Sequence, residues 1–279
     1  MLEIGKYNRL RVKSSATVGL YLTNGEEDVL LPTKYIPENT SVGDLLDVFV
    51  YLDNENRPVA TTLKPYACVG DFAFLSVKQV NEHGAFLDWG IAKDVFVPYA
   101  EQRVEMETGE RYLVYLLIDE FSGRIAATAK WSKYLHDASN LQEGQEVQLL
   151  IAEKTPLGFK AIINNECEGL LYENEIFTPI QSGDKIKGFV RLVREDGKVD
   201  LRLQQEGVEA MNDAKSQVLS YLRQNGGVLA LGDKSSPEEI YRQLQMSKKN
   251  FKKAIGGLYK DQLISLSDHE IRLLELTEE

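Results

Sequence analysis

The segment from Val77 to Gly90 reads VKQVNEHGAFLDWG and is the strongest indication of the fold, because its order recurs twice more along the chain. In each copy a lead Gly opens a short apolar run, an acidic residue precedes a Leu- or Val-rich run, a second Gly follows, and an acidic turn closes a strand pair. The two glycines lie 24, 25 and 25 residues apart. They are Gly19 and Gly43, Gly84 and Gly109, and Gly158 and Gly183. A spacing repeated in triplicate indicates three related small domains.

Each copy supplies about five short runs of Val, Ile, Leu, Phe and Tyr between Gly, Asn and Asp clusters, which is typical of a small all-β unit. A five-stranded barrel closes its own sheet and removes most exposed edges. We therefore predict three barrels, at residues 1–63, 66–133 and 142–206. A sandwich or a Tudor-like barrel is the alternative for each copy.

The last domain, residues 209–279, has a different pattern. Apolar residues at helical spacing predict a helix from Glu209 to Gln224, ended by two glycines. Ser236 followed by Pro237 predicts the start of a second helix, and Ser247 predicts the start of a third. Two apolar runs around a Ser-Asp-His turn then predict a hairpin. Three helices and a hairpin are typical of a winged helix, so the predicted fold class is mainly β with a C-terminal α+β module.

The third predicted helix is basic in an acidic protein. The chain carries a net charge of −11, yet the segment from Ile240 to Lys260 holds six basic residues and no acidic one. Phe251, Ile255, Leu258 and Tyr259 form its predicted apolar stripe, and the predicted nucleic-acid contacts are Lys248, Lys249, Lys252, Lys253 and Lys260. Recognition helices present such a face to a nucleic-acid backbone. A solvated lysine face and a protein-contact module remain alternatives.

The barrel copies resemble the S-one RNA-binding domain, a subclass of the oligonucleotide-binding fold, and the middle copy carries the family's Gly-Ala-Phe-Leu and Gly-Arg-Ile motifs. The resemblance implies that Phe86 stacks on bases, that His83 occupies an aromatic position before the lead Gly, and that Asp119 and Arg124 meet the nucleic-acid backbone. In the divergent first copy, Tyr21 keeps an aromatic residue at the position of Phe86. In the divergent third copy, Lys160 stands at that position, and Tyr172 and Lys198 occupy plausible binding positions.

These residue types suit a flexible polynucleotide. Every base has a π face, so an exposed ring stacks on bases without reading their identity, worth roughly 1 to 3 kcal/mol per base. Arg124 and Lys198 would add salt-dependent contacts with phosphate. Single-stranded RNA is the expected ligand, because only splayed bases reach Phe86. The alternative is that Phe86 fills the barrel core, since alternation alone does not say which face is inside.

The complete order of three barrels and a winged helix resembles the bacterial conserved virulence factor B family. Its landmarks here are the segments 84–90, 94–98, 247–253 and 256–260. The resemblance implies a cytoplasmic RNA-binding regulator of gene expression, with RNA contacts shared between a barrel and the winged helix. DNA binding through the winged helix and a protein-interaction scaffold docked on ribosome or transcription proteins remain open.

Composition narrows the function further. Cys68 and Cys167 lie in different copies without a CxxC neighbour, and three isolated His residues give no zinc spacing, so we expect two thiols, no metal and no cofactor. The sequence has no nucleophile triad, phosphate loop or convergent carboxylates, so we expect no enzymatic activity. No apolar run approaches membrane-span length, so we expect a soluble, cytoplasmic protein without a membrane partner.

Overall fold

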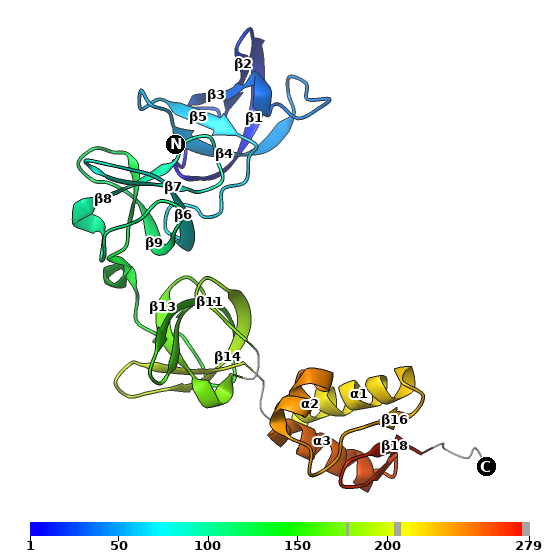
Figure 1. Cartoon of the computed structure of the whole chain (residues 1–279). Helices are drawn as coiled ribbons and strands as arrows, with labels where there is room; N and C mark the ends of the chain where they lie inside the picture. Colours follow the sequence, from blue (N-terminus) through cyan, green and yellow to red (C-terminus); the bar gives the residue numbers. More distant parts are fainter. Residues whose placement is uncertain (177–178, 204–207, 275–279) are drawn as a thin grey trace. The chain divides into compact units, whose positions relative to one another are not determined.

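The computed structural model describes residues 1–176, 179–203 and 208–274, and for residues 174 and 208–213 it describes the backbone alone. Two compact units divide the chain, Met1–Leu135 and His136–Glu279. The described residues form three closed five-stranded barrels and a C-terminal module of helices and a small sheet (Figure 1). The predicted fold class is therefore confirmed, and closure of the sheets excludes the sandwich alternative.

The first barrel consists of β1 (Lys6–Ala16), β2 (Gly19–Thr23), β3 (Asp28–Pro32), β4 (Leu45–Leu52) and β5 (Pro58–Thr61). The second consists of β6 (Phe72–Asn81), β7 (Gly84–Asp88), β8 (Val95–Pro98), β9 (Arg111–Ile118) and β10 (Ile125–Thr128). The third consists of β11 (Glu146–Thr155), β12 (Gly158–Ile163), β13 (Cys167–Tyr172), β14 (Lys185–Val193) and β15 (Val199–Arg202). Short 3-10 turns follow the third strand of each barrel, at Thr33–Tyr35, Tyr99–Glu101 and Glu173–Glu175.

All three barrels share one strand order. The first three strands form an antiparallel meander, the third pairs in parallel with the fifth, and the fourth closes the barrel against the first. Each first strand shifts register at the same place, at Val12/Ser14, Val77/Gln79 and Ile151/Glu153. Such bulges bend a strand enough to close a small barrel. This is the strand order of the oligonucleotide-binding fold.

The backbone geometry at the first residue of each second strand requires the lead glycine of the repeat. Their φ angles lie between +144° and +152°, a region that side-chain-bearing residues rarely adopt. A Cβ atom at Gly19, Gly84 or Gly158 would lie 2.1, 2.2 or 2.1 Å from a carbonyl oxygen of the third strand. Only a residue without a side chain allows the second and third strands to approach this closely.

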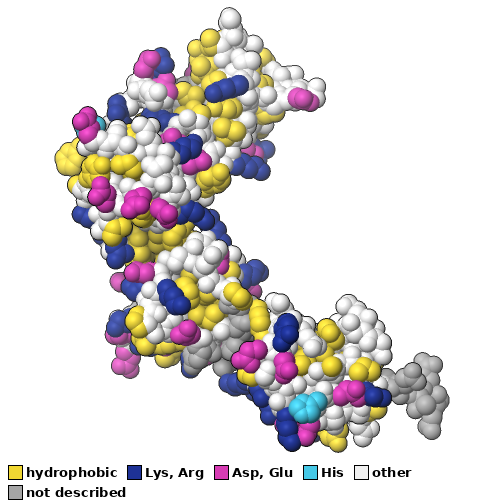
Figure 2. Space-filling view, in the orientation of Figure 1, with side chains coloured by type: hydrophobic (Ala, Val, Ile, Leu, Met, Phe, Trp, Pro, Cys, Tyr) yellow, Lys and Arg dark blue, Asp and Glu magenta, His cyan; other side chains and the backbone are white. Residues whose placement is uncertain are grey.

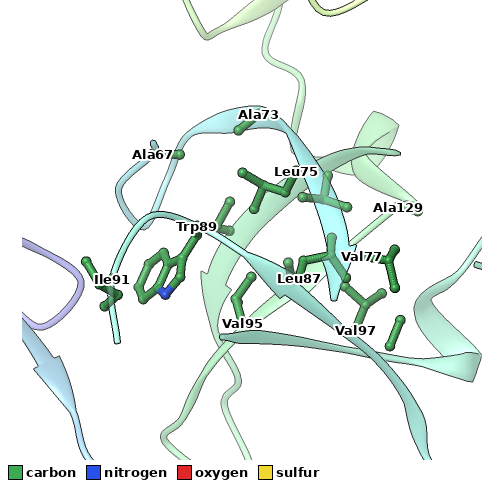
Figure 3. Packing of buried hydrophobic residues seen from close by; sticks show 14 of the residues in the cluster. Ala67, Ala73, Leu75, Val77, Leu87, Trp89, Ile91, Val95, Val97 and Ala129 are labelled. Atoms are coloured by element: carbon green, nitrogen blue, oxygen red, sulfur yellow. The ribbon is translucent and has the colours of Figure 1, made fainter. Parts of the chain in front are cut away.

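Alternation along β7 places Phe86 on the outside of the second barrel. Ala85 and Leu87 are fully buried, whereas Phe86 is half-exposed. Leu87, Val95 and Val97 point into the same apolar interior (Figure 3). The alternative in which Phe86 fills the core is therefore wrong.

The first two barrels pack against each other within the first unit. Strand β4 is buried on both faces, because Val48 and Val50 fill the first barrel while Phe49 and Tyr51 join the core cluster of the second. The rings of Phe49 and Trp89 meet edge to face, with centroids 5.5 Å apart. Trp89 and Ile91 lie at the end of the second barrel's core that is near the backbone of the first barrel (Figure 3).

The C-terminal module contains α1 (Val208–Gln224), β16 (Val228–Leu229), α2 (Pro237–Leu244), α3 (Lys248–Lys260), β17 (Ile264–Leu266) and β18 (Ile271–Leu273). Ser236 and Ser247 cap α2 and α3 as predicted. Strand β16 was not predicted, and it pairs with β18 as the third strand of the sheet. Tyr259 was predicted in the apolar stripe of α3 but is 58% exposed, which corrects that assignment. No helix in the described ranges is long and apolar enough to cross a membrane.

Candidate nucleic-acid interface

Two aromatic rings lie side by side on the outer face of the second barrel. Phe86 on β7 is the register partner of Phe96 on β8, and their ring centroids are 5.0 Å apart at an interplanar angle of 40°. Both rings are half-exposed, while Val95 and Val97 on either side of Phe96 are buried. The pair therefore offers an apolar π surface to solvent, which suits base stacking.

The loops beside this strand pair carry further binding groups. His83 lies in the β6–β7 turn with a side chain that is 73% exposed, 3.6 Å from the Glu82 carboxylate. Phe121 lies in the β9–β10 loop and is fully exposed. Barrels of this fold bind oligonucleotides with the second and third strands and with the loops after the first and fourth strands. All of these positions carry aromatic or imidazole side chains in the second barrel.

Asp119 shapes the β9–β10 loop. Its Oδ1 accepts hydrogen bonds from the backbone N–H of Ser122 at 2.8 Å and from the Ser122 hydroxyl at 2.7 Å. These bonds lower the pKa of Asp119. The Asp119 carboxylate therefore holds the turn that carries Phe121 and Arg124. Its contact with the nucleic-acid backbone stays a prediction.

Arg124 differs from Lys78 and Lys133 of the second barrel in its partner. Its Nε donates to Oδ1 of Asn56 at 2.9 Å, and no carboxylate pairs with it among the described residues. By contrast, Lys78 lies 2.8 Å from Asp94, and Lys133 also forms an ion pair with a carboxylate. The hydrogen bond to Asn56 uses Nε alone, so the terminal nitrogens could reach a phosphate, and this contact stays a prediction.

The equivalent sites of the other barrels lack a ring pair. Tyr21 is 40% exposed, but its register partner is Leu30. Lys160 has Leu170 as its partner and lies 3.0 Å from the Glu168 carboxylate. Two inclined rings thus occur in the second barrel alone among these three strand pairs.

The remaining predicted residues of the third barrel are held by protein partners. The Tyr172 hydroxyl is hydrogen-bonded to Arg194, which pairs with Asp200 at 2.8 Å. Lys198 lies 2.8 Å from the Asp196 carboxylate. A ligand phosphate would have to displace these carboxylates, so the third barrel is the weaker candidate.

The exposed face of α3 forms a second candidate surface. Lys249, Lys253 and Lys260 are exposed and have no carboxylate partner in the described part of the chain. Lys252 is exposed but lies 3.0 Å from Asp233, and Lys248 is half-buried. A Cβ placed on Gly256 would meet nothing within 4 Å, so this position of the face is open.

Charge elsewhere is mixed. Figure 2 shows Lys and Arg side chains interspersed with Asp and Glu over the visible surface.

The two cysteines are free thiols, and burial raises the pKa of both Cys68 and Cys167. Within residues 1–176, 179–203 and 208–274, no cluster of His, Cys, Asp and Glu has the arrangement of a metal site.

Two binding candidates were not predicted from the sequence. Phe96 follows Asp94-Val95 in a short apolar run, and only its register with Phe86 shows that its ring faces outward. Phe121 lies in a turn, where alternation gives no information. The available sequence signal was a Phe in the predicted Ser-Gly turn, three residues before Arg124.

Comparison with known proteins gives two family matches. Residues 216–273 match the CvfB-like winged helix domain, and residues 4–63 match the S1 domain. The S1 match falls on the first barrel, which the motifs had indicated to be a divergent copy.

Similarity to curated proteins extends along most of the chain. Conserved virulence factor B of Staphylococcus saprophyticus is 25% identical over 263 residues, covering 90% of this chain and 87% of that protein. The resemblance to the conserved virulence factor B family is confirmed. The uncharacterized protein YitL of Bacillus subtilis is 27% identical over 267 residues, covering 92% of this chain and 89% of the relative. Both similarities therefore extend over the barrels and the C-terminal module of this chain.

A solved multidomain protein with nucleic acid binding domains from Streptococcus pneumoniae is 23% identical, with a TM-score of 0.42, covering 97% of this chain and 98% of that one. The S1 and winged-helix matches by themselves support nucleic-acid binding.

Proposed function

We propose that this protein is a non-catalytic regulator that binds single-stranded RNA through the second barrel and the basic face of α3. The observation that carries the proposal is the outward ring pair of Phe86 and Phe96 on an S1-type barrel. Base stacking on such a pair needs no base-specific hydrogen bond, so recognition is weakly sequence-specific. By resemblance to the CvfB-like proteins, binding is proposed to change the expression of other genes.

Single-stranded RNA is favoured over a duplex by the shape of this site. A base must leave its stack to lie on the Phe86 ring, and unpaired loops and ends supply such bases. The mixed surface charge and the net charge of −11 allow few phosphate contacts. We therefore expect modest affinity with a shallow dependence on salt.

The α3 face supplies the second contact. Lys249, Lys253 and Lys260 recur at spacings of four and seven residues, which places them on one side of a helix. These lysines have no carboxylate partner among the residues that the structure describes, so they offer positive charge to a phosphate backbone. Because recognition helices of winged-helix domains also enter DNA grooves, DNA is the competing ligand for this domain.

Filter binding with labelled oligouridylate, the matching RNA duplex and a DNA duplex at two salt concentrations tests the proposal. We expect the single strand to bind best, and the Lys249→Gln/Lys253→Gln variant to weaken its binding at low salt. The matched control is Lys234→Gln, an exposed lysine of the same domain that pairs with Asp268 at 2.7 Å. Tight duplex binding with a steep salt dependence would contradict the proposal.

The alternative is a protein-interaction scaffold. The acidic balance of the chain favours it, because net negative charge repels polynucleotides. Replacing Phe86 and Arg124 together distinguishes the two functions. RNA affinity falls if the protein is an RNA binder, and a negligible affinity stays unchanged if it is a scaffold.

A further inference from the structure

The contact between the first two barrels has a polar rim with two cations. Nζ of Lys93, in the β7–β8 loop, donates to the carbonyl oxygens of Leu52 at 2.9 Å and Asp53 at 2.8 Å. Nε of Arg124, in the β9–β10 loop, donates to Oδ1 of Asn56 at 2.9 Å. Both cations of the second barrel are thus held on one turn of the first barrel, residues 52–56. We call this place the inter-barrel seam.

The carboxylates of that turn are directed to another residue. Asp53 lies 2.8 Å from Arg57, and Glu55 lies 2.9 Å from a different nitrogen of the same guanidinium. Neither Lys93 nor Arg124 forms an ion pair with a carboxylate within the described ranges. Two positive groups therefore share the seam without a bonded counter-charge.

The titration of Lys93 agrees with this geometry. Its pKa is lowered, first by burial and next by the positive charge of Arg124, while Asp53 acts in the opposite direction. The positive charge of Arg124 therefore disfavours the protonated form of Lys93. A bound anion would relieve the repulsion between these two cations.

We propose that Lys93 and Arg124 together hold one phosphate of a single-stranded nucleic acid at the inter-barrel seam. The backbone carbonyls accept two of the three N–H groups of Lys93, and Asn56 accepts only the Nε–H of Arg124. The third N–H and the terminal guanidinium nitrogens remain for phosphate oxygens. This proposal rests on the proposed function, and it adds a contact at the first barrel to the RNA-binding surface.

Asn56 acts as a positioning residue in this site. Its φ angle of +62° lies in the left-handed region, which Asn adopts more readily than most residues. From that turn its side-chain oxygen accepts the Nε–H of Arg124 and fixes the plane of the guanidinium. Arg124 can then present its remaining nitrogens as a fork.

Fluorescence anisotropy of labelled oligouridylate, measured with the full-length protein over a series of salt concentrations, tests the seam. The Lys93→Gln/Arg124→Gln double variant should reduce the slope of log affinity against log salt by about 0.7, the value for one phosphate contact on a single strand. Each single variant should reduce the slope by part of that amount. Lys93→Arg should keep the slope, because it keeps the charge. Lys130→Gln is the matched control, since Nζ of Lys130 also donates to a carbonyl, that of Ala100 at 2.6 Å.

Several outcomes would overturn the seam. One is a wild-type slope for Lys93→Gln beside a reduced slope for Arg124→Gln. A second is an equal loss for Lys93→Gln and Lys93→Arg, which would indicate disturbed packing instead of lost charge; thermal melting of both variants checks this. A third is saturable calorimetric binding of inorganic phosphate that Lys93→Gln abolishes while RNA binding persists, which would assign the site to a free anion.

Failure of the proposed function gives a different result. Phe86→Leu/Phe96→Leu removes the stacking rings and leaves both seam cations in place. Wild-type RNA affinity in that variant would reject stacking on the second barrel. The slopes of Lys93→Gln and Arg124→Gln report on the seam independently.

Discussion

Replacing Phe86 by leucine tests the ring pair directly. One face of the Phe86 ring is turned toward Phe96, with centroids 5.0 Å apart and planes inclined by 40°, so the pair offers stacking to about one base. The expected loss is the stacking energy of a single base, roughly 1 to 3 kcal/mol. This corresponds to an affinity decrease of about 5- to 150-fold. Because the pair acts as one platform, Phe86→Leu/Phe96→Leu should lose less than the sum of the single variants.

The assay is fluorescence anisotropy with labelled oligouridylate at low salt. Folding should persist, because leucine keeps apolar contact at a half-exposed site, and the lost ring pair is worth about 0.5 to 1.5 kcal/mol of stability. Phe159→Leu in the third barrel is the control, since Phe159 is also a half-buried Phe on the second strand of its barrel. Its position corresponds to Ala85, and the position of Phe86 is occupied by Lys160. The reasoning is refuted if Phe86→Leu changes affinity by less than about twofold, or if Phe159→Leu weakens binding equally.

Three further substitutions give distinct expected results. Gly84→Ala should lower the free energy of unfolding by about 2 kcal/mol or more in urea titration, because its Cβ would lie 2.2 Å from the Val97 carbonyl oxygen at a positive φ. Phe121→Ala should leave unfolding unchanged within about 0.5 kcal/mol, since the ring is fully exposed, but it should weaken RNA binding by roughly 1 kcal/mol or more if a base stacks there. Asp119→Ala should lower the melting temperature at neutral pH, because the Ser122 hydrogen bonds that depress the pKa of Asp119 stabilise the folded loop. That contribution is present above the unfolded pKa of about 3.9 and is lost as pH falls through the lower folded pKa, so the difference between variant and wild type should shrink in acid.

Controls separate the causes in these experiments. Gly25→Ala places a side chain at a φ of +99° with nothing within 4 Å, so it reports backbone strain without the close strand contact at Gly84. A melting difference for Asp119→Ala that stays constant down to pH 2 would exclude the Asp119 carboxylate as its source. Unchanged RNA affinity in Phe121→Ala would remove the β9–β10 loop tip from the interface.

The sequence predicts the barrels well, because the steric requirement for a glycine at the start of the second strand recurs in all three copies. The lead glycines lie where a Cβ would meet the backbone of the third strand, so their spacing records the strand geometry. The outward position of Phe86 follows from alternation once the buried face is known. The helix starts at Ser236 and Ser247 follow from capping chemistry, which depends on a few neighbouring residues.

Other features depend on contacts between distant residues. The run Val48–Tyr51 is apolar without alternation, and its outer face is buried by Trp89, which a period-two pattern does not identify. Strand β16 is only two residues long, too short to give a periodic signal. Tyr259 is at helical spacing with Ile255, yet its position on α3 faces solvent. Pairing of Arg124 with Asn56 joins residues 68 positions apart, beyond any local pattern.

The doubly buried strand β4 sets the smallest fragment that can be expected to fold. A fragment ending after β5 would expose Phe49 and Tyr51, which are almost fully buried in the intact chain. Two neighbouring aromatic side chains on one strand face would then form an exposed hydrophobic patch prone to self-association. Truncations for biophysical work should therefore end near Leu135, where the first compact unit ends, and the paired barrels should denature in a single cooperative transition.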